Sequence, residues 1–108
     1  MKDLQSTEEF RELSQSNKRF CALYSADWCP DCVVIKSLLP ELENLYGDDM
    51  EFRVVDRDDF MPLAQEYDVM GIPSFVVFHE GKVVANFISS LRKTRQQIVD
   101  FLEKAKTA

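Results

Sequence analysis

The order of apolar and polar residues along the chain predicts strands that alternate with helices. The run at 19–25 is nearly continuous in apolar character, which is typical of a strand covered on both faces, as in a parallel sheet between helices. Glu80-Gly81 separates two further apolar runs and indicates a hairpin. The expected strands cover residues 2–5, 19–25, 51–56, 74–79 and 82–88.

Apolar residues at helical spacing predict four helices. They cover residues 7 to about 15, 30 to about 46, about 62–67, and 95 to at least 105. Ser6 with Glu9, and Thr94 with Gln97, fit the capping-box pattern at the start of the first and last helices. Pro40 lies inside the second helix and predicts a kink there. The apolar stripe expected on that helix comprises Val33, Val34, Ile35, Leu38, Leu39, Leu42 and Leu45.

This element order predicts an α/β fold with a central mixed β-sheet and helices on both faces. A strand, a helix and a strand come first, and a hairpin and a closing helix follow. With 108 residues and 45% apolar content, the chain is expected to form one domain over residues 1–108.

Charge and cysteine content narrow the function classes. A net charge of −6 disfavours nucleic-acid and anionic-membrane partners, and no apolar run approaches the ~20 residues that span a bilayer. The first five residues lack the apolar core of a signal peptide, so we expect a cytoplasmic protein. Three cysteines, an odd number, do not indicate a structural disulfide framework.

The segment Cys29-Pro30-Asp31-Cys32 joins the 19–25 strand to the second helix. If Cys29 is the N-cap and Pro30 the first helical residue, the Cys29 sulfur faces the free amides of the first turn. Those amides and the helix dipole favour the thiolate, which is the nucleophile. Cys32, one turn further in, is then suited to resolve a mixed disulfide.

Two carboxylates are expected to tune this chemistry. Asp27 and Asp31 flank Cys29 in sequence, and a nearby negative charge opposes formation of a second one. Because stabilising the thiolate makes a disulfide more oxidising, we expect a Cys29–Cys32 disulfide that is not strongly oxidising.

The motif Trp28-Cys29-Pro30-Asp31-Cys32 after a hydrophobic strand, with Gly71-Ile72-Pro73 downstream, resembles the thioredoxin family. The resemblance covers nearly the whole chain and implies a thioredoxin fold and reduction of protein disulfides. It implies no bound cofactor, because a thioredoxin-reductase-like partner or a small thiol supplies the electrons. It also implies that Trp28 flanks the disulfide and that Ile72 and Pro73, joined by a cis bond, face the cysteines and pair with substrate. A monomer is expected.

The chain departs from the family at three places. Leu23 occupies the position of a buried acidic residue six places before the first cysteine, and Phe52, next to Arg53, falls near the usual strand lysine. Cys32 would then lose its proton to solvent, or through water to a base such as Asp27 or Glu51. Ser89-Ser90-Leu91 replaces a groove glycine, and Arg92 and Lys93 close behind could narrow or recharge the groove.

Three other functions stay open on the sequence. A thioredoxin-like binding module with weak or no catalysis would fit the loss of the acid at Leu23, and a glutaredoxin-like activity is a further option. A metal site is disfavoured because the motif supplies two of zinc's usual four ligands, and neither Cys21 nor His79 lies at zinc-site spacing. We expect Cys21 to be a buried hydrophobe, His79 an exposed turn residue, and Asp56–Asp59 a solvated acidic run that could orient a basic partner.

Overall fold

The computed structural model describes residues 1–108 and contains one five-stranded mixed sheet. The strand order is β1-β3-β2-β4-β5, with parallel pairing of β1 to β3 and of β3 to β2, and antiparallel pairing of β2 to β4 and of β4 to β5. The strands are β1 (Lys2–Asp3), β2 (Arg19–Ser25), β3 (Met50–Asp56), β4 (Ser74–His79) and β5 (Lys82–Phe87).

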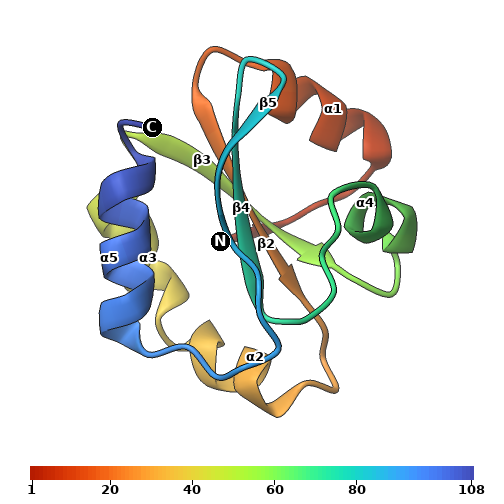
Figure 1. Cartoon of the computed structure of the whole chain (residues 1–108), viewed down its shortest axis with the longest axis vertical. Helices are drawn as coiled ribbons and strands as arrows, with labels where there is room; N and C mark the ends of the chain where they lie inside the picture. The colour runs from red at the N-terminus through yellow and green to blue at the C-terminus, as the bar shows by residue number, and fades with distance from the viewer.

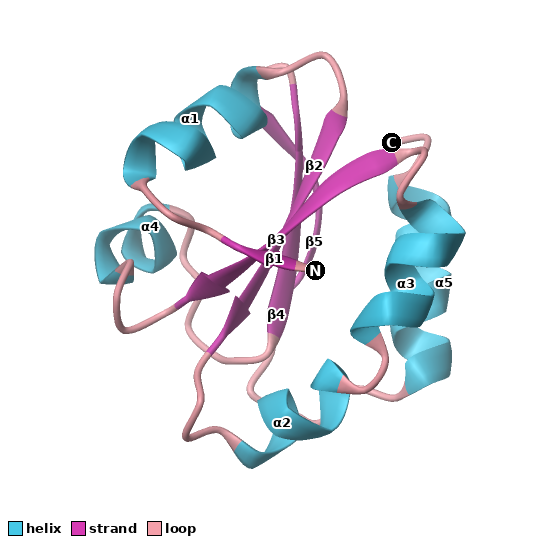
Figure 2. Ribbon diagram, turned by 180° about the vertical axis from the view of Figure 1, so that it is seen from behind, coloured by secondary structure: helices cyan, strands magenta, loops and turns pink.

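Helices cover both faces of the sheet, as the sequence predicts (Figures 1 and 2). On one face lie α1 (Thr7–Gln15) and α4 (Met61–Glu66), and on the other α3 (Leu39–Tyr46) and α5 (Arg95–Ala105). The short helix α2 (Pro30–Lys36) lies beyond one end of the strands. None of these helices has the length and apolar content needed to cross a bilayer.

The strand predictions are confirmed with small shifts at the ends. Residues 19–25 and 74–79 have the expected bounds; β3 begins at Met50 and β5 ends at Phe87. Central β2 is hydrogen-bonded on both edges and buried from Phe20 to Ser25, which is the environment its apolar run predicts. The hairpin turn at Glu80-Gly81 is confirmed, with positive φ at both residues (53° and 82°).

The prediction of one kinked helix over 30–46 is wrong, because the chain forms two separate helices. The backbone N–H of Leu38 bonds to Ile35, which closes α2 with a tight turn, and α3 starts at Leu39 with Pro40 in its first turn. Pro40 has no N–H to offer the carbonyl of Lys36, so the helical ladder ends there. Three residues of the expected apolar stripe are exposed and lie outside the core: Val33, Val34 and Leu45.

One predicted capping box forms completely and the other in part. Thr94 accepts from the amide of Gln97, and the Gln97 side chain accepts from the amide of Thr94. Ser6 accepts from the amide of Glu9, but the Glu9 carboxylate accepts from the amide of Gln5, one residue earlier than expected.

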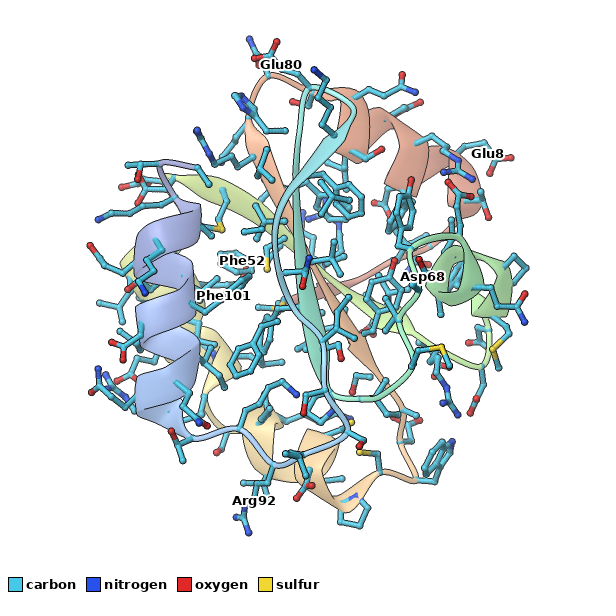
Figure 3. All side chains as sticks on the ribbon, in the orientation of Figure 1. Glu8, Phe52, Asp68, Glu80, Arg92 and Phe101 are labelled. Carbon is cyan, nitrogen blue, oxygen red and sulfur yellow. The ribbon has the colours of Figure 1, made fainter.

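The core has two layers, one on each face of the sheet. Residues of β2 alternate between them: Phe20, Ala22 and Tyr24 belong to the α1 and α4 side, and Cys21 and Leu23 to the α3 and α5 side. The first layer is strongly aromatic, with ring contacts among Phe10, Phe20, Tyr67 and Phe78. In the second, Phe52 and Phe101 lie between the sheet and α5 (Figure 3).

Cys21 and His79 differ in how well the sequence placed them. Cys21 is fully buried, which confirms the expectation of a small core hydrophobe. His79 ends β4 as a half-buried residue whose ring Nε2 lies 2.9 Å from the carbonyl of Asn17, so the expectation of an exposed turn residue is wrong. The Asn17 carbonyl that contacts the ring belongs to the α1–β2 connection, so no local sequence pattern predicts this contact.

Burial of Cys21 predicts a loss of stability at alkaline pH. Burial raises the pKa of its thiol, so above pH ~8.5 the unfolded chain releases this proton while the folded protein keeps it. The free energy of unfolding should therefore fall with rising pH, by roughly 2 kcal/mol between pH 9 and 11 for this one group.

The measurement is urea unfolding of reduced wild type and Cys21→Ala across that range. Both proteins keep Tyr24, whose pKa burial also raises, so the difference between the two curves isolates Cys21. Parallel curves would contradict the prediction.

Candidate active site

Cys29 caps the N-terminus of α2, and Pro30 is the first helical residue, as predicted. The Cys29 Sγ accepts a hydrogen bond from the backbone amide of Cys32 at 3.3 Å. A sulfur that accepts an amide bond at a helix start lies where negative charge is favoured. All three cysteines are free thiols, so the structure describes the reduced pair.

Cys32 is more deeply enclosed than Cys29, with 2% of its surface exposed against 6%. Its pKa is raised, first by burial and then by a hydrogen bond with Cys29 that favours its protonated form. The side chain of Ser25 and the backbone of Ala26 partly oppose this rise. The two sulfurs are therefore unequal: burial and the bond with Cys29 favour the protonated form of Cys32, whereas Cys29 is less enclosed and accepts the amide of Cys32.

The Ile72-Pro73 segment faces the cysteines, as expected. The peptide bond between these residues is cis, and the carbonyl oxygen of Ile72 lies 3.9 Å from the Cys29 Sγ. Ile72 itself is buried in the same core layer as the two cysteines. This brings Cys29 and the residue expected to pair with substrate to one place.

Gly71 allows this segment to pack directly on the β5–α5 connection. A Cβ on Gly71 would lie 2.6 Å from the backbone nitrogen of Ser90 and 2.8 Å from the carbonyl carbon of Ser89. Buried Ser74 joins the same two segments, because its hydroxyl donates to the Gly71 carbonyl at 2.6 Å and accepts from the Ser89 amide at 3.3 Å. Two backbone segments are thus held together behind the cysteines.

Trp28 lies at the surface, 61% exposed, and two residues of the β3–α4 connection hold its ring. Its Nε1 donates to Asp58 at 2.7 Å, and the guanidinium of Arg57 lies 5.2 Å from the ring centroid. The parallel register of β2 and β3 pairs Ser25 with Asp56, so the segments that leave both strands emerge side by side. Asp58 was expected to belong to a solvated acidic run. The adjacent ends of β2 and β3 instead bring it to the Trp28 ring.

Each of the two aspartates near Cys29 has a cation beside it. The Asp27 carboxylate lies 3.4 Å from Lys36, and its side chain is 90% exposed, so solvent screens its charge. Asp31 is half-buried and lies 4.0 Å from the guanidinium of Arg92. Of the two, Asp31 is the less screened by solvent, and a tuning role for either stays a prediction.

The positions of the missing acid and lysine are apolar and filled. Leu23 and Phe52 are buried in the core layer on the α3 and α5 side. Glu51, named above as a possible base, is misplaced for it: it pairs with Phe20 at the far end of β3, and Arg53 holds its carboxylate. No buried carboxylate stands beside Cys32.

Neither cysteine lines a large pocket. The largest pocket, of about 690 Å³, is lined by residues such as Leu4, Asp27 and Lys36 and contains neither Cys29 nor Cys32. No group of three or more His, Cys, Asp or Glu side chains is arranged to hold a metal ion.

This arrangement of two cysteines at a helix start, opposite a cis-proline segment, agrees with comparisons to known proteins. The sequence model of the thioredoxin family, described as "Thioredoxin", matches residues 2–104. The chain belongs to the thioredoxin family. It is 29% identical to thioredoxin H3 of Arabidopsis thaliana over 101 residues, which is 94% of this chain and 82% of that protein. It is 34% identical to an H-type thioredoxin of Fagopyrum esculentum over 83 residues, 77% of this chain and 71% of that one.

Solved structures agree on the fold. The thioredoxin of Malassezia sympodialis superimposes with a TM-score of 0.86 at 21% identity, covering 97% of this chain and 90% of that one. The architecture is therefore the thioredoxin fold, with a five-stranded mixed sheet and flanking helices.

Close packing at Gly71 predicts that Gly71→Ala destabilises the protein. The added methyl group would overlap the backbone of Ser89 and Ser90, and neither segment can yield without moving the other. Overpacking of this kind costs about 1–3 kcal/mol. Urea unfolding gives the free energy, and the backbone amide shifts of Ile72 and Ser89 report the displacement.

The matched control is Ser90→Ala, because Ser90 is exposed in the same connection and should keep wild-type stability. An alanine at 71 with wild-type stability and unmoved amide shifts would disprove the packing constraint.

Proposed function

We propose that this thioredoxin-family protein is a thiol–disulfide oxidoreductase that reduces disulfides in protein substrates. The observation that carries the proposal is the inequality of the two sulfurs. Cys29 accepts the amide of Cys32 at the helix start, whereas burial and the bond with Cys29 keep Cys32 protonated. Cys29 is therefore suited to attack the substrate disulfide, and Cys32 is suited to resolve the mixed disulfide.

The exchange proceeds in two displacements. The Cys29 thiolate attacks one sulfur of the substrate disulfide, the substrate S–S bond breaks, and the leaving thiolate takes a proton from solvent. Cys32 then loses its proton to solvent and attacks the Cys29 sulfur of the mixed disulfide. The Cys29–Cys32 bond forms, the second substrate thiol leaves, and two electrons have passed to the substrate.

The surface around Cys29 suits an extended peptide as substrate. Trp28, Met70 and Leu91 are strongly exposed apolar residues on the three segments that meet at Cys29. Exposed apolar side chains around a reactive group are suited to contact with another protein. We propose that Trp28 flanks the bound peptide and that Ile72 and Pro73 pair with its backbone.

A thioredoxin-reductase-like protein or a small thiol would return the oxidised pair to the dithiol, without a bound cofactor. We propose that the chain acts in a reducing compartment, as one domain and as a monomer.

A solved structure of the same fold, 23% identical, comes from work on thiol resolution in a yeast mitochondrial 1-Cys peroxiredoxin through glutathione and thioredoxin systems. This makes an oxidised peroxiredoxin a suitable test substrate here.

A binding module with weak catalysis is the second candidate, and Leu23 is the observation that favours it. With a buried leucine where the family is expected to carry an acid, no carboxylate assists deprotonation of Cys32. Proton-transfer help of that kind is typically worth 10²–10⁴-fold. The oxidoreductase and the binding module differ in the effect that cysteine substitutions should have on activity and on partner binding.

Cysteine variants should separate the roles of the two sulfurs. With dithiothreitol as reductant, Cys29→Ser should reduce the disulfides of insulin or of an oxidised peroxiredoxin no faster than dithiothreitol alone. Cys32→Ser should still attack and should accumulate a mixed disulfide through Cys29, visible by intact-mass spectrometry. The matched control is Cys21→Ala, which removes a thiol on the other side of the sheet and should keep the wild-type rate.

Equal disulfide-reducing activity of wild type and Cys29→Ser would reject the proposal that the protein is an enzyme that reduces disulfides through Cys29. If a Cys29→Ser, Cys32→Ser double variant also bound the peroxiredoxin as tightly as wild type, the binding module would be supported instead.

The equilibrium potential of the Cys29–Cys32 couple tests the direction of electron flow. Because carboxylates stand near Cys29, we expect a potential that does not exceed the cytosolic glutathione poise of about −220 to −320 mV. Equilibration with glutathione buffers, quenched by acid and read by mass, gives the value. A potential well above that poise would make the protein an oxidant.

A further inference from the structure

Lys93 is the only charged residue that is buried, with 4% of its surface exposed. It lies in the connection between β5 and α5, one residue before the N-cap Thr94. Lysine is almost never buried without a partner, because removing an ammonium group from water is costly. A buried lysine at this point of the fold therefore requires a compensating environment.

The hydrogen bonds of Lys93 leave its charge uncompensated. Its Nζ donates to the carbonyls of Ser89 at 3.0 Å and Leu91 at 3.3 Å, and it lies 5.0 Å from the ring centroid of Phe87. Carbonyl oxygens and an aromatic face stabilise a cation. They carry no net negative charge, and no carboxylate forms an ion pair with Lys93.

The negative charges that act on Lys93 come from the active-site helix. The β5–α5 connection runs past α2 (Figure 1), and Arg92 lies next to α2 in Figure 3. Burial lowers the pKa of Lys93, whereas Cys32, Asp31 and Cys29, in that order, raise it. Lys93 also binds the carbonyl of Ser89, whose backbone packs on Gly71 next to Ile72. The Ile72 carbonyl lies 3.9 Å from the Cys29 Sγ, so the contacts of Lys93 lead to the cysteine pair.

We propose that Lys93 is a positioning residue for the second displacement, whose buried ammonium stabilises the Cys32 thiolate. This rests on the proposed function, since only a resolving cysteine must ionise during the exchange. The attraction is reciprocal: a thiolate that favours the ammonium is favoured by it to the same extent. The cation offsets part of the burial that otherwise keeps Cys32 protonated.

Such a cation replaces the missing acid by a different physical means. A buried carboxylate would accept the proton of Cys32, and Leu23 removes that route. With Lys93 in place the proton goes to solvent, and the anion left behind has a positive charge near it. The anion then attacks the Cys29 sulfur, the Cys29–Cys32 bond forms, and the substrate thiolate departs and takes a proton from solvent.

The first test measures the ionisation of Cys32 directly, in a Cys29→Ser background. The rate of iodoacetamide labelling of Cys32, located by mass spectrometry, is followed against pH. Lys93→Met should move the midpoint up by about one pH unit, with a roughly tenfold slower rate at pH 7. Because burial also sets the pKa of Cys32, a charge effect on the midpoint is separated from a packing effect by a variant that alters the side chain at 93 and keeps the positive charge.

Two variants serve as controls. Lys93→Arg keeps the charge and should restore the lower midpoint. Lys82→Met removes an exposed lysine at the opposite end of β5 and should leave the midpoint unchanged. An unchanged midpoint in Lys93→Met, even with reduced stability, overturns the proposal.

A second measurement needs no substitution at Lys93 and stands if Lys93→Met does not fold. The side-chain NMR titration of Lys93 is compared in oxidised protein, reduced wild type and reduced Cys32→Ser. The proposal is supported if the titration midpoint of Lys93 is higher in reduced wild type than in oxidised protein and in reduced Cys32→Ser. It is overturned if the Lys93 midpoint is the same in reduced wild type and in reduced Cys32→Ser. Because neither readout is disulfide reduction, a protein that fails to reduce substrates can still pass or fail this test.

Discussion

Burial of β2 at the centre of the sheet is the constraint from which the site follows. The strand is paired on both edges, by β3 and β4, and packed on both faces. It therefore cannot shift without disturbing every other layer. Because β2 ends at Ser25, the segment that leaves it carries Trp28, Cys29 and Cys32 past the sheet edge at a fixed place.

Its two partner strands supply the rest of the site from the same edge. Parallel β3 ends beside it and delivers Arg57 and Asp58 to the Trp28 ring. Antiparallel β4 begins there and delivers the carbonyl of Ile72 to Cys29. A site assembled from three strand ends is positioned by the sheet, although the cysteines themselves stand on a helix of only two turns. Rigid elements of this kind are what precise positioning of reacting groups requires.

Much of this could be predicted from local patterns. Continuous apolar character placed β2, and the spacing of Cys29 and Cys32 with Pro30 between them placed the N-cap. The helix break was missed because Pro40 indicates a defect in the ladder, but not whether the chain bends or restarts. Lys93 was expected only to narrow or recharge the groove, since its burial depends on contacts with Phe87 and Ser89 that no periodicity encodes. Residues whose environment is made by another segment are those that sequence patterns place least well.

Division of the core into two layers also insulates the redox pair from the third thiol. Cys29 and Cys32 belong to the layer on the α1 and α4 side, whereas Cys21 belongs to the opposite layer. For Cys21 to exchange with either of them, the middle strand would have to leave its ladder and turn over. The sheet therefore keeps the third thiol apart from the proposed exchange by position alone, without a further bond to sequester it.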